Sequence, residues 1–273
     1  MPRYDRYRRH AVRERPTQNV DEALAALSAD ELRAFVRDAL GQLDAGPRGD
    51  LEDLLLLRAV RGNAGWKPAA PSPAFVDEAK KFIAAARTVA RADPADIDDL
   101  LRQALTASLA GDHVSARAVF DVVLAPICQG DIDLGQDEMV DEVLSVDLHE
   151  CGRRFMTAVY VTTPLTERAA ALIAAHELAH DVSYTQDPIE EIARALDGKV
   201  PELEAFLPLW VARLENETKK RTSDWESDHD RWLRAAIGRR DGVAGLARLA
   251  RSSKTSEAAR AWCAALVEKG DWA

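Results

Sequence analysis

Residues 163–180 read TPLTERAAALIAAHELAH, and this stretch is the best guide to the fold of the chain. Pro164 favours a helix that begins at or just after it, because the first helical turn does not use the N–H that proline lacks. The alanines and leucines that follow have high helix propensity. The spacing predicts one helix whose apolar face continues into two histidines; that face consists of Leu165, Ala169, Leu172, Ile173, His176 and His180.

The last five residues of this helix have the pattern HExxH. Histidines four residues apart lie on one helical face, so His176 and His180 can bind one metal ion. Glu177 between them is then placed to take a proton from a metal-bound water. The alternative is structural: both histidines continue an apolar face, and a histidine there can simply pack and form hydrogen bonds.

The residues before this helix favour β-structure. Val146–His149 alternates apolar and polar side chains, and Phe155–Thr163 is rich in valine, tyrosine and threonine. Cys151–Arg154 between them is a candidate turn, so the pattern predicts a small β-hairpin. A distorted helix is the alternative, because short apolar runs do not distinguish the two.

HELAH after a predicted strand resembles the zincin-type zinc metallopeptidases, over about residues 146–233. The resemblance implies zinc as cofactor, His176 and His180 as ligands, Glu177 as the catalytic base, and a peptide or protein substrate pairing with the strand 155–161. For the third ligand, His229 with Trp232 three residues later resembles the Spartan-type zincins. Asp230 replaces their usual glycine and the interval from His180 is longer, so Glu226 remains an alternative ligand.

A second resemblance competes with the first. Gly111-Asp112-His113, followed by Ala116 and Phe120, is similar to the second helix of a tetratricopeptide unit. A partial match recurs from Trp262 to Trp272, but the two are not separated by a whole number of repeats. This resemblance implies a non-catalytic helical-repeat scaffold that binds another protein.

Composition supports a mainly helical chain. Its 273 residues are 47% hydrophobic and 30% charged, as in folded globular proteins. We therefore expect a mainly α (α+β) fold, in which a zincin-like core with a small hairpin is embedded among helix pairs. The expected organisation is a basic arm (1–18), a small helical unit (19–61) that includes a capping box at Ser28–Glu31, a linker (62–73) and a helical body (74–273).

Charge is unevenly distributed. The net charge of −10 disfavours non-specific nucleic-acid binding by the body. The arm differs, since six arginines and two tyrosines lie within residues 3–15. It is either a solvated tail or a contact to nucleic acid, with arginines on phosphates and tyrosines stacked on bases.

The remaining signals concern location. Cys128, Cys151 and Cys263 are far apart in the sequence and form no CxxC pair, as expected in a reducing compartment. No apolar run approaches the ~20 residues that cross a bilayer, and no apolar segment of a signal peptide follows the arginine-rich start. These features predict a cytoplasmic protein without a membrane contact.

Overall fold

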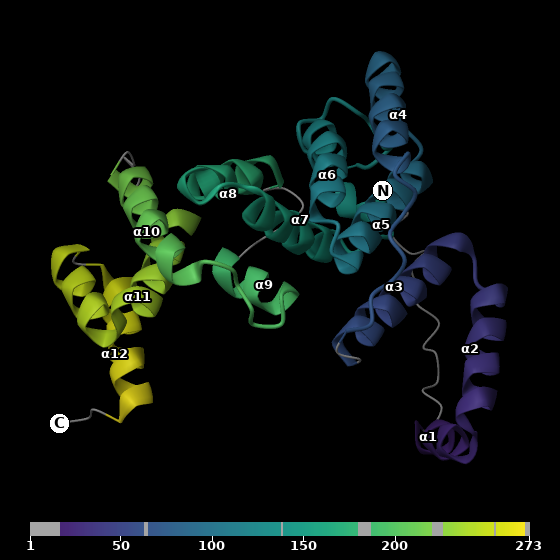
Figure 1. Cartoon of the computed structure of the whole chain (residues 1–273), viewed down its shortest axis with the longest axis horizontal. Helices are drawn as coiled ribbons and strands as arrows, with labels where there is room; N and C mark the ends of the chain where they lie inside the picture. Colours follow the sequence, from purple (N-terminus) through teal and green to yellow (C-terminus); the bar gives the residue numbers. More distant parts are fainter. Residues whose placement is uncertain are drawn as a thin grey trace, which may run out of the picture. The chain divides into compact units, whose positions relative to one another are not determined.

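The computed structural model confirms that the protein is mainly helical (Figure 1). It describes residues 17–62, 65–137, 139–179, 187–219, 226–253 and 255–270. Within these ranges there are twelve α-helices and one 3-10 turn, and extended pairing is limited to a bridge between Arg91 and Asp133. The helices are α1 Thr17–Ala26, α2 Ala29–Gln42, α3 Ala45–Gly62, α4 Phe75–Val89, α5 Pro94–Ala110, α6 His113–Cys128, α7 Leu148–Thr162, α8 Leu165–Ala179, α9 Pro188–Ala195, α10 Leu203–Lys219, α11 Asp228–Ser253 and α12 Ser256–Lys269.

The chain divides into two compact units, Met1–Glu52 and Asp53–Ala273. We call them the N-terminal unit and the body. The boundary lies inside α3, and residues 65–72 of the expected linker follow this helix without regular structure. The basic arm lies outside the described residues, apart from the first residues of α1.

The N-terminal unit shows clear local helix signals. The predicted capping box is confirmed, because the Ser28 N–H donates to Glu31 Oε2 (2.8 Å) and the Glu31 N–H donates to Ser28 Oγ (3.3 Å). At the other end of α2, Arg48 Nε donates to the Leu40 carbonyl oxygen (2.9 Å). These bonds satisfy backbone groups that a helix leaves open at its ends.

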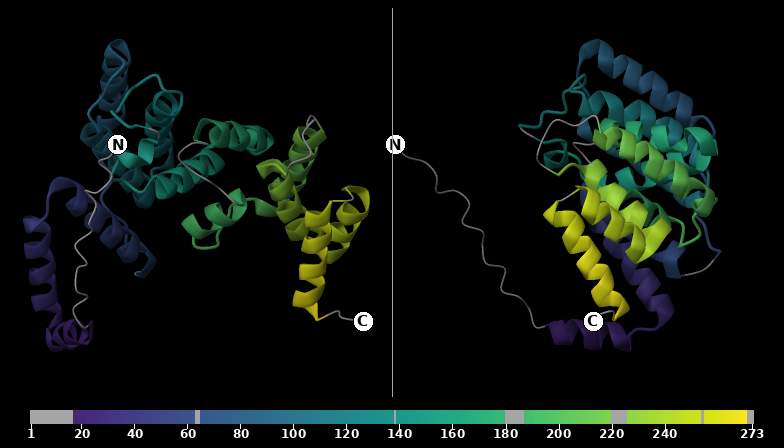
Figure 2. Two further views of the ribbon diagram at one scale, coloured as in Figure 1. Left: turned by 180° about the vertical axis from the view of Figure 1, so that it is seen from behind. Right: turned by 90° about the vertical axis from the view of Figure 1, so that its left-hand side faces the viewer.

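The body is built from helices that contact their near neighbours in the chain. Extensive contacts join α4 to α6, α5 to α6 and α7, α6 to α7 and α8, α7 to α8 and α9, α8 to α10, α10 to α11, and α11 to α12. In each of these contacts the two helices are at most two positions apart in the helix order. Figures 1 and 2 show the body helices following one another in this order.

Aromatic side chains connect these helices. The Phe120 ring on α6 lies 5.9 Å from the Phe155 ring on α7. Further along, Tyr160 of α7 meets Phe206 of α10 edge-on at 5.1 Å. Trp210 of α10 then stacks on Trp232 of α11 at 5.9 Å. Each ring is at most 1% exposed, so these pairs form the centre of the body core.

The predicted hairpin at residues 146–163 is wrong, because Leu148–Thr162 forms α7. Asp147 caps the helix by accepting from the Glu150 N–H at 3.0 Å. The threonines fit because their hydroxyls bond back one turn, as Thr157 does to the Arg153 carbonyl oxygen (2.8 Å). Most of the helix is buried between neighbouring helices, and this packing outweighs the β-propensity of its side chains. The proposed turn and the substrate-pairing strand 155–161 are therefore helical.

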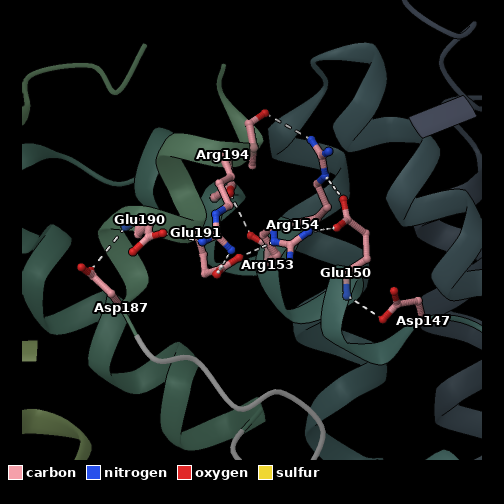
Figure 3. A network of polar contacts seen from close by, with 10 residues as sticks. Asp147, Glu150, Arg153, Arg154, Asp187, Glu190, Glu191 and Arg194 are labelled. Carbon is pink, nitrogen blue, oxygen red and sulfur yellow. Dashed lines mark hydrogen bonds and ion pairs between the residues drawn. The ribbon is translucent and has the colours of Figure 1, made fainter. Parts of the chain in front are cut away.

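Charged side chains join α7 to α9 (Figure 3). Glu150 and Arg154, which are 3% and 5% exposed, form an ion pair of 2.7 Å within α7. Arg154 also donates to the Ala195 carbonyl oxygen (3.4 Å), and Arg153 pairs with Glu191 of α9. Burying both charges is tolerated because each has a charged or hydrogen-bonding partner.

Helix α11 is broken at Gly242, whose φ of 61° and ψ of −151° lie in a region that only glycine adopts readily. A Cβ added at Gly245 would come within 2.8 Å of Ile237 Cγ2, so the two halves meet closely here. None of the described helices is long and apolar enough to cross a membrane.

Candidate functional site

His176 lies near the end of α8 and is buried, with 7% of its surface exposed. Its Nε2 lies 3.1 Å from Oδ2 of Asp228, the first residue of α11. This hydrogen bond joins two helices whose residues are 52 positions apart in the sequence. A buried imidazole without such a partner would be costly, so Asp228 accounts for how His176 is accommodated in the core.

Trp232 encloses the same imidazole. The His176 and Trp232 rings are 4.4 Å apart and nearly perpendicular, at 73°. Trp232 in turn stacks on Trp210, so the histidine continues the aromatic core described above. We call His176, Asp228 and Trp232 the histidine cluster.

The other predicted site residues have different surroundings. Glu177 is exposed on α8, and His180 lies outside the described residues. His229 is half-buried, and its ring lies 5.4 Å from the Trp232 ring. The exposed Glu226 pairs with Arg234. The structure thus brings the start of α11 to His176 through Asp228, the residue before the predicted ligand.

Sequence reasoning did not identify Asp228. A usable signal was the capping box one residue earlier, in which the Ser227 N–H donates to Asp230 Oδ2 at 2.8 Å and the Asp230 N–H to Ser227 Oγ at 3.3 Å. This motif starts α11 at Asp228 and places Asp228 and Trp232 four residues apart on one face. The contact between this face of α11 and His176 depends on how α8 and α11 pack against each other.

The described residues provide few ligands for a zinc ion. Within the described ranges no group of three or more His, Cys, Asp or Glu side chains could hold a metal ion. His176 and Asp228 provide two donor atoms, and a zinc site needs at least three protein ligands. The described residues alone therefore do not form a complete zinc site.

A small pocket lies outside the histidine cluster. It has a volume of about 110 Å³ and is lined by parts of α11 and α12, with Glu226, Asp230 and Glu257 as its carboxylates. Its lining includes neither His176 nor His229. The pocket and the histidine cluster are therefore separate, although both include residues of α11.

The first tetratricopeptide-like segment is a tight helical pair. Gly111 ends α5 with a φ of 90°, a left-handed conformation that favours glycine. Asp112 then caps α6 by accepting from the Ser115 N–H at 3.1 Å. Ala116 and Phe120 are fully buried on α6. In the second segment, Gly270 ends α12 with a φ of 75°, and residues 271–273 lie outside the described ranges.

His113, next to this turn, has an unusual environment. Its Nδ1 is buried without a hydrogen-bond partner. Burial, with the positive charges of Arg154 and Lys67, lowers the pKa of His113 below its ordinary value. The protonated form is therefore disfavoured in the folded protein.

A scan against protein-family models and searches of curated proteins and of solved structures gave no match to this chain.

Proposed function

We propose that this protein is a non-catalytic helical scaffold that binds another protein. The observation that carries the proposal is the near-neighbour packing of α4–α12. Repeat proteins have this property, because each helical unit buries its apolar face mainly against the units next to it. The exposed faces of such a stack offer a long surface for a partner.

The α5–α6 pair supports the same function. Its turn, its small residue Ala116 and its buried Phe120 correspond to the features by which the sequence resembles a tetratricopeptide unit. The units need not be identical in length, since stacking requires only that successive helix pairs match at their shared faces. The irregular spacing of the two segments is compatible with this view.

The histidine cluster also has a structural role in this proposal. His176 bonds to Asp228 and packs against Trp232, so it links α8 to α11. Hydrogen bonding and packing together account for the burial of His176 without a catalytic or metal-binding role.

The test begins with the full-length protein as bait, and the partner it enriches is then purified. Titration calorimetry should give saturable binding, and hydrogen exchange should show new protection on exposed faces of α4–α12. The partner should remain intact, and a zinc chelator should leave the affinity unchanged. Cleavage of the partner that depends on metal, or protection confined to the N-terminal unit, would contradict the scaffold.

The second candidate is a zinc-dependent metallopeptidase of zincin type, and one distance favours it. The 3.1 Å between His176 Nε2 and Asp228 Oδ2 is close to the roughly 3.3 Å that separates two ligand atoms bound at ~2.05 Å to a tetrahedral zinc. In this candidate His176, His180 and either Asp228 or His229 hold the metal. Zinc bound there would supply an activated water, and the exposed Glu177 would accept its proton.

Metal analysis separates the two candidates. A peptidase should carry about one zinc per chain after purification without added metal, and His176→Ala with His180→Ala should lose it. His149→Ala is the matched control and should retain it. Asp228→Ala and His229→Ala then identify the third ligand, since only the ligand's loss lowers the zinc content. A metal-free wild-type protein leaves the scaffold as the function.

A further inference from the structure

The N-terminal unit leaves its apolar side chains exposed. Two of them recur one turn apart in α1, a third follows the end of that helix, and Phe35 of α2 is exposed by 57%. Gly49 is the one buried residue among residues 19–52. The side chains in α1 are Val20 and Leu24, which are 53% and 42% exposed, and the one after it is Leu27, which is 37% exposed.

The described part of this unit, residues 17–52, is only 36 residues long. Chains below about 40 residues usually depend on disulfides, metals or association, because they bury too little surface. Residues 17–52 contain no cysteine and no histidine, so a disulfide or a zinc site cannot stabilise them. Association that covers the apolar side chains is the remaining route.

The distribution of charge indicates what covers the exposed apolar side chains of the N-terminal unit. Residues 1–16 carry six arginines against two acidic residues, whereas residues 17–52 carry eight acidic residues against three arginines. Without the arms, the acidic helices of two copies would therefore repel each other. The positive charge of the arm of one copy is complementary to the negative charge of the helices of another. Residues 1–52 as a whole are nearly balanced, with nine arginines and ten acidic residues.

We propose that the N-terminal unit is a homodimerisation surface, in which α1 and α2 of two copies meet and each basic arm lies on the acidic helices of its partner. A two-fold dimer uses the same patch twice, which suits a segment that carries both charges. This inference is independent of the scaffold proposal.

The area that a stable dimer interface requires indicates that the basic arm contributes to it. Helix α2 is about 21 Å long, and two helices side by side are roughly 20 Å wide, so they cover about 400 Å². A stable interface covers about 800 Å² on each partner. An arm of 16 residues reaches up to ~50 Å and can supply the missing area.

The first experiment measures the oligomeric state of the full chain by light scattering and sedimentation. The wild type should be a dimer whose dissociation constant rises with salt, because exposed charges are screened. Leu24→Glu with Phe35→Glu should raise that constant on the order of tenfold or more. The control is Val89→Glu with Val114→Glu, which changes two exposed apolar residues of the body and should leave the dimer unchanged. A monomeric wild type, or equal effects of both pairs, would overturn the proposal.

The second experiment tests whether the basic arm of one copy binds the acidic helices of the other. In one variant Arg6, Arg8, Arg9 and Arg13 become glutamate; in the other Asp21, Asp38 and Asp44 become lysine. Each variant alone should be monomeric, because arm and helices then have the same sign. Their mixture should form a heterodimer, since each arm finds oppositely charged helices. Failure of the mixture to dimerise would show that the arm of one copy does not bind the helices of the other, and would overturn this part of the proposal.

Discussion

The N-terminal unit and the body are both helical, yet they differ in what stabilises their helices. Helix α2 has a complete capping box and no buried residue. Helix α7 has weaker local signals for a helix, but eleven of its fifteen residues are buried. Local signals are therefore sufficient to define where a helix starts, whereas the body helices depend on the tertiary contacts that bury them.

The largest expected difference between the two units concerns a matched pair of phenylalanines. Phe120→Ala should destabilise the body by about 3–5 kcal/mol, because it empties a fully buried site. Phe35→Ala should change the unfolding free energy by less than about 0.5 kcal/mol, since the side chain is already exposed. Urea denaturation at a protein concentration low enough to keep the chain monomeric checks both values. Equal losses would mean that the N-terminal unit has a core of its own.

Ion pairs should show the same contrast. Glu150→Ala should cost about 3 kcal/mol, because it leaves the buried Arg154 with its bond to the Ala195 carbonyl but without its carboxylate. Asp30→Ala removes an exposed partner of Arg33 in the N-terminal unit and should cost less than about 0.5 kcal/mol. Thermal and urea denaturation of the two variants measure these costs. A small loss for Glu150→Ala would show that the network in Figure 3 contributes little to stability.

Two glycine substitutions should have opposite signs. Gly242→Ala should destabilise the body by about 1–3 kcal/mol, because alanine disfavours the backbone conformation at the break in α11. Gly41→Ala in α2 should stabilise its helix by about 0.5–1 kcal/mol, as the position is helical and nothing lies within 4 Å of an added Cβ. Helix content and denaturation midpoints provide the measurement. A neutral Gly242→Ala would indicate that the two halves of α11 can rejoin.

The smallest expected effect is a pH dependence of the stability of the body. The pKa of His113 is lowered by burial, so the unfolded chain binds a proton that the folded chain resists. Stability should therefore fall as the pH drops below the ordinary histidine pKa of about 6.5, and the loss should end below the folded pKa. His113→Gln should reduce this loss, measured as the unfolding free energy between pH 7.5 and 5. Residues 17–52 contain no histidine, so the helices of the N-terminal unit should not contribute. An unchanged pH profile in His113→Gln would assign the loss to other groups.

Several helix starts were accessible from the sequence, for local reasons. Ser28, Asp93 and Asp112 accept hydrogen bonds from the next turn, and Pro94 occupies the first helical position. Such signals act within three or four residues, so they can be read without knowing the fold. The candidate site was less accessible, because His176 and Asp228 are separated by 52 residues.

The amino-acid sequence by itself determined that the chain is mainly helical, where several helices begin, and that charge is divided between a basic arm and acidic helices. The tertiary structure decided that residues 148–162 are a helix and that His176 is paired with Asp228 against Trp232. The physical reason is the range of the interactions. Caps and propensities act along the backbone, whereas burial and partner choice arise only when distant segments pack together.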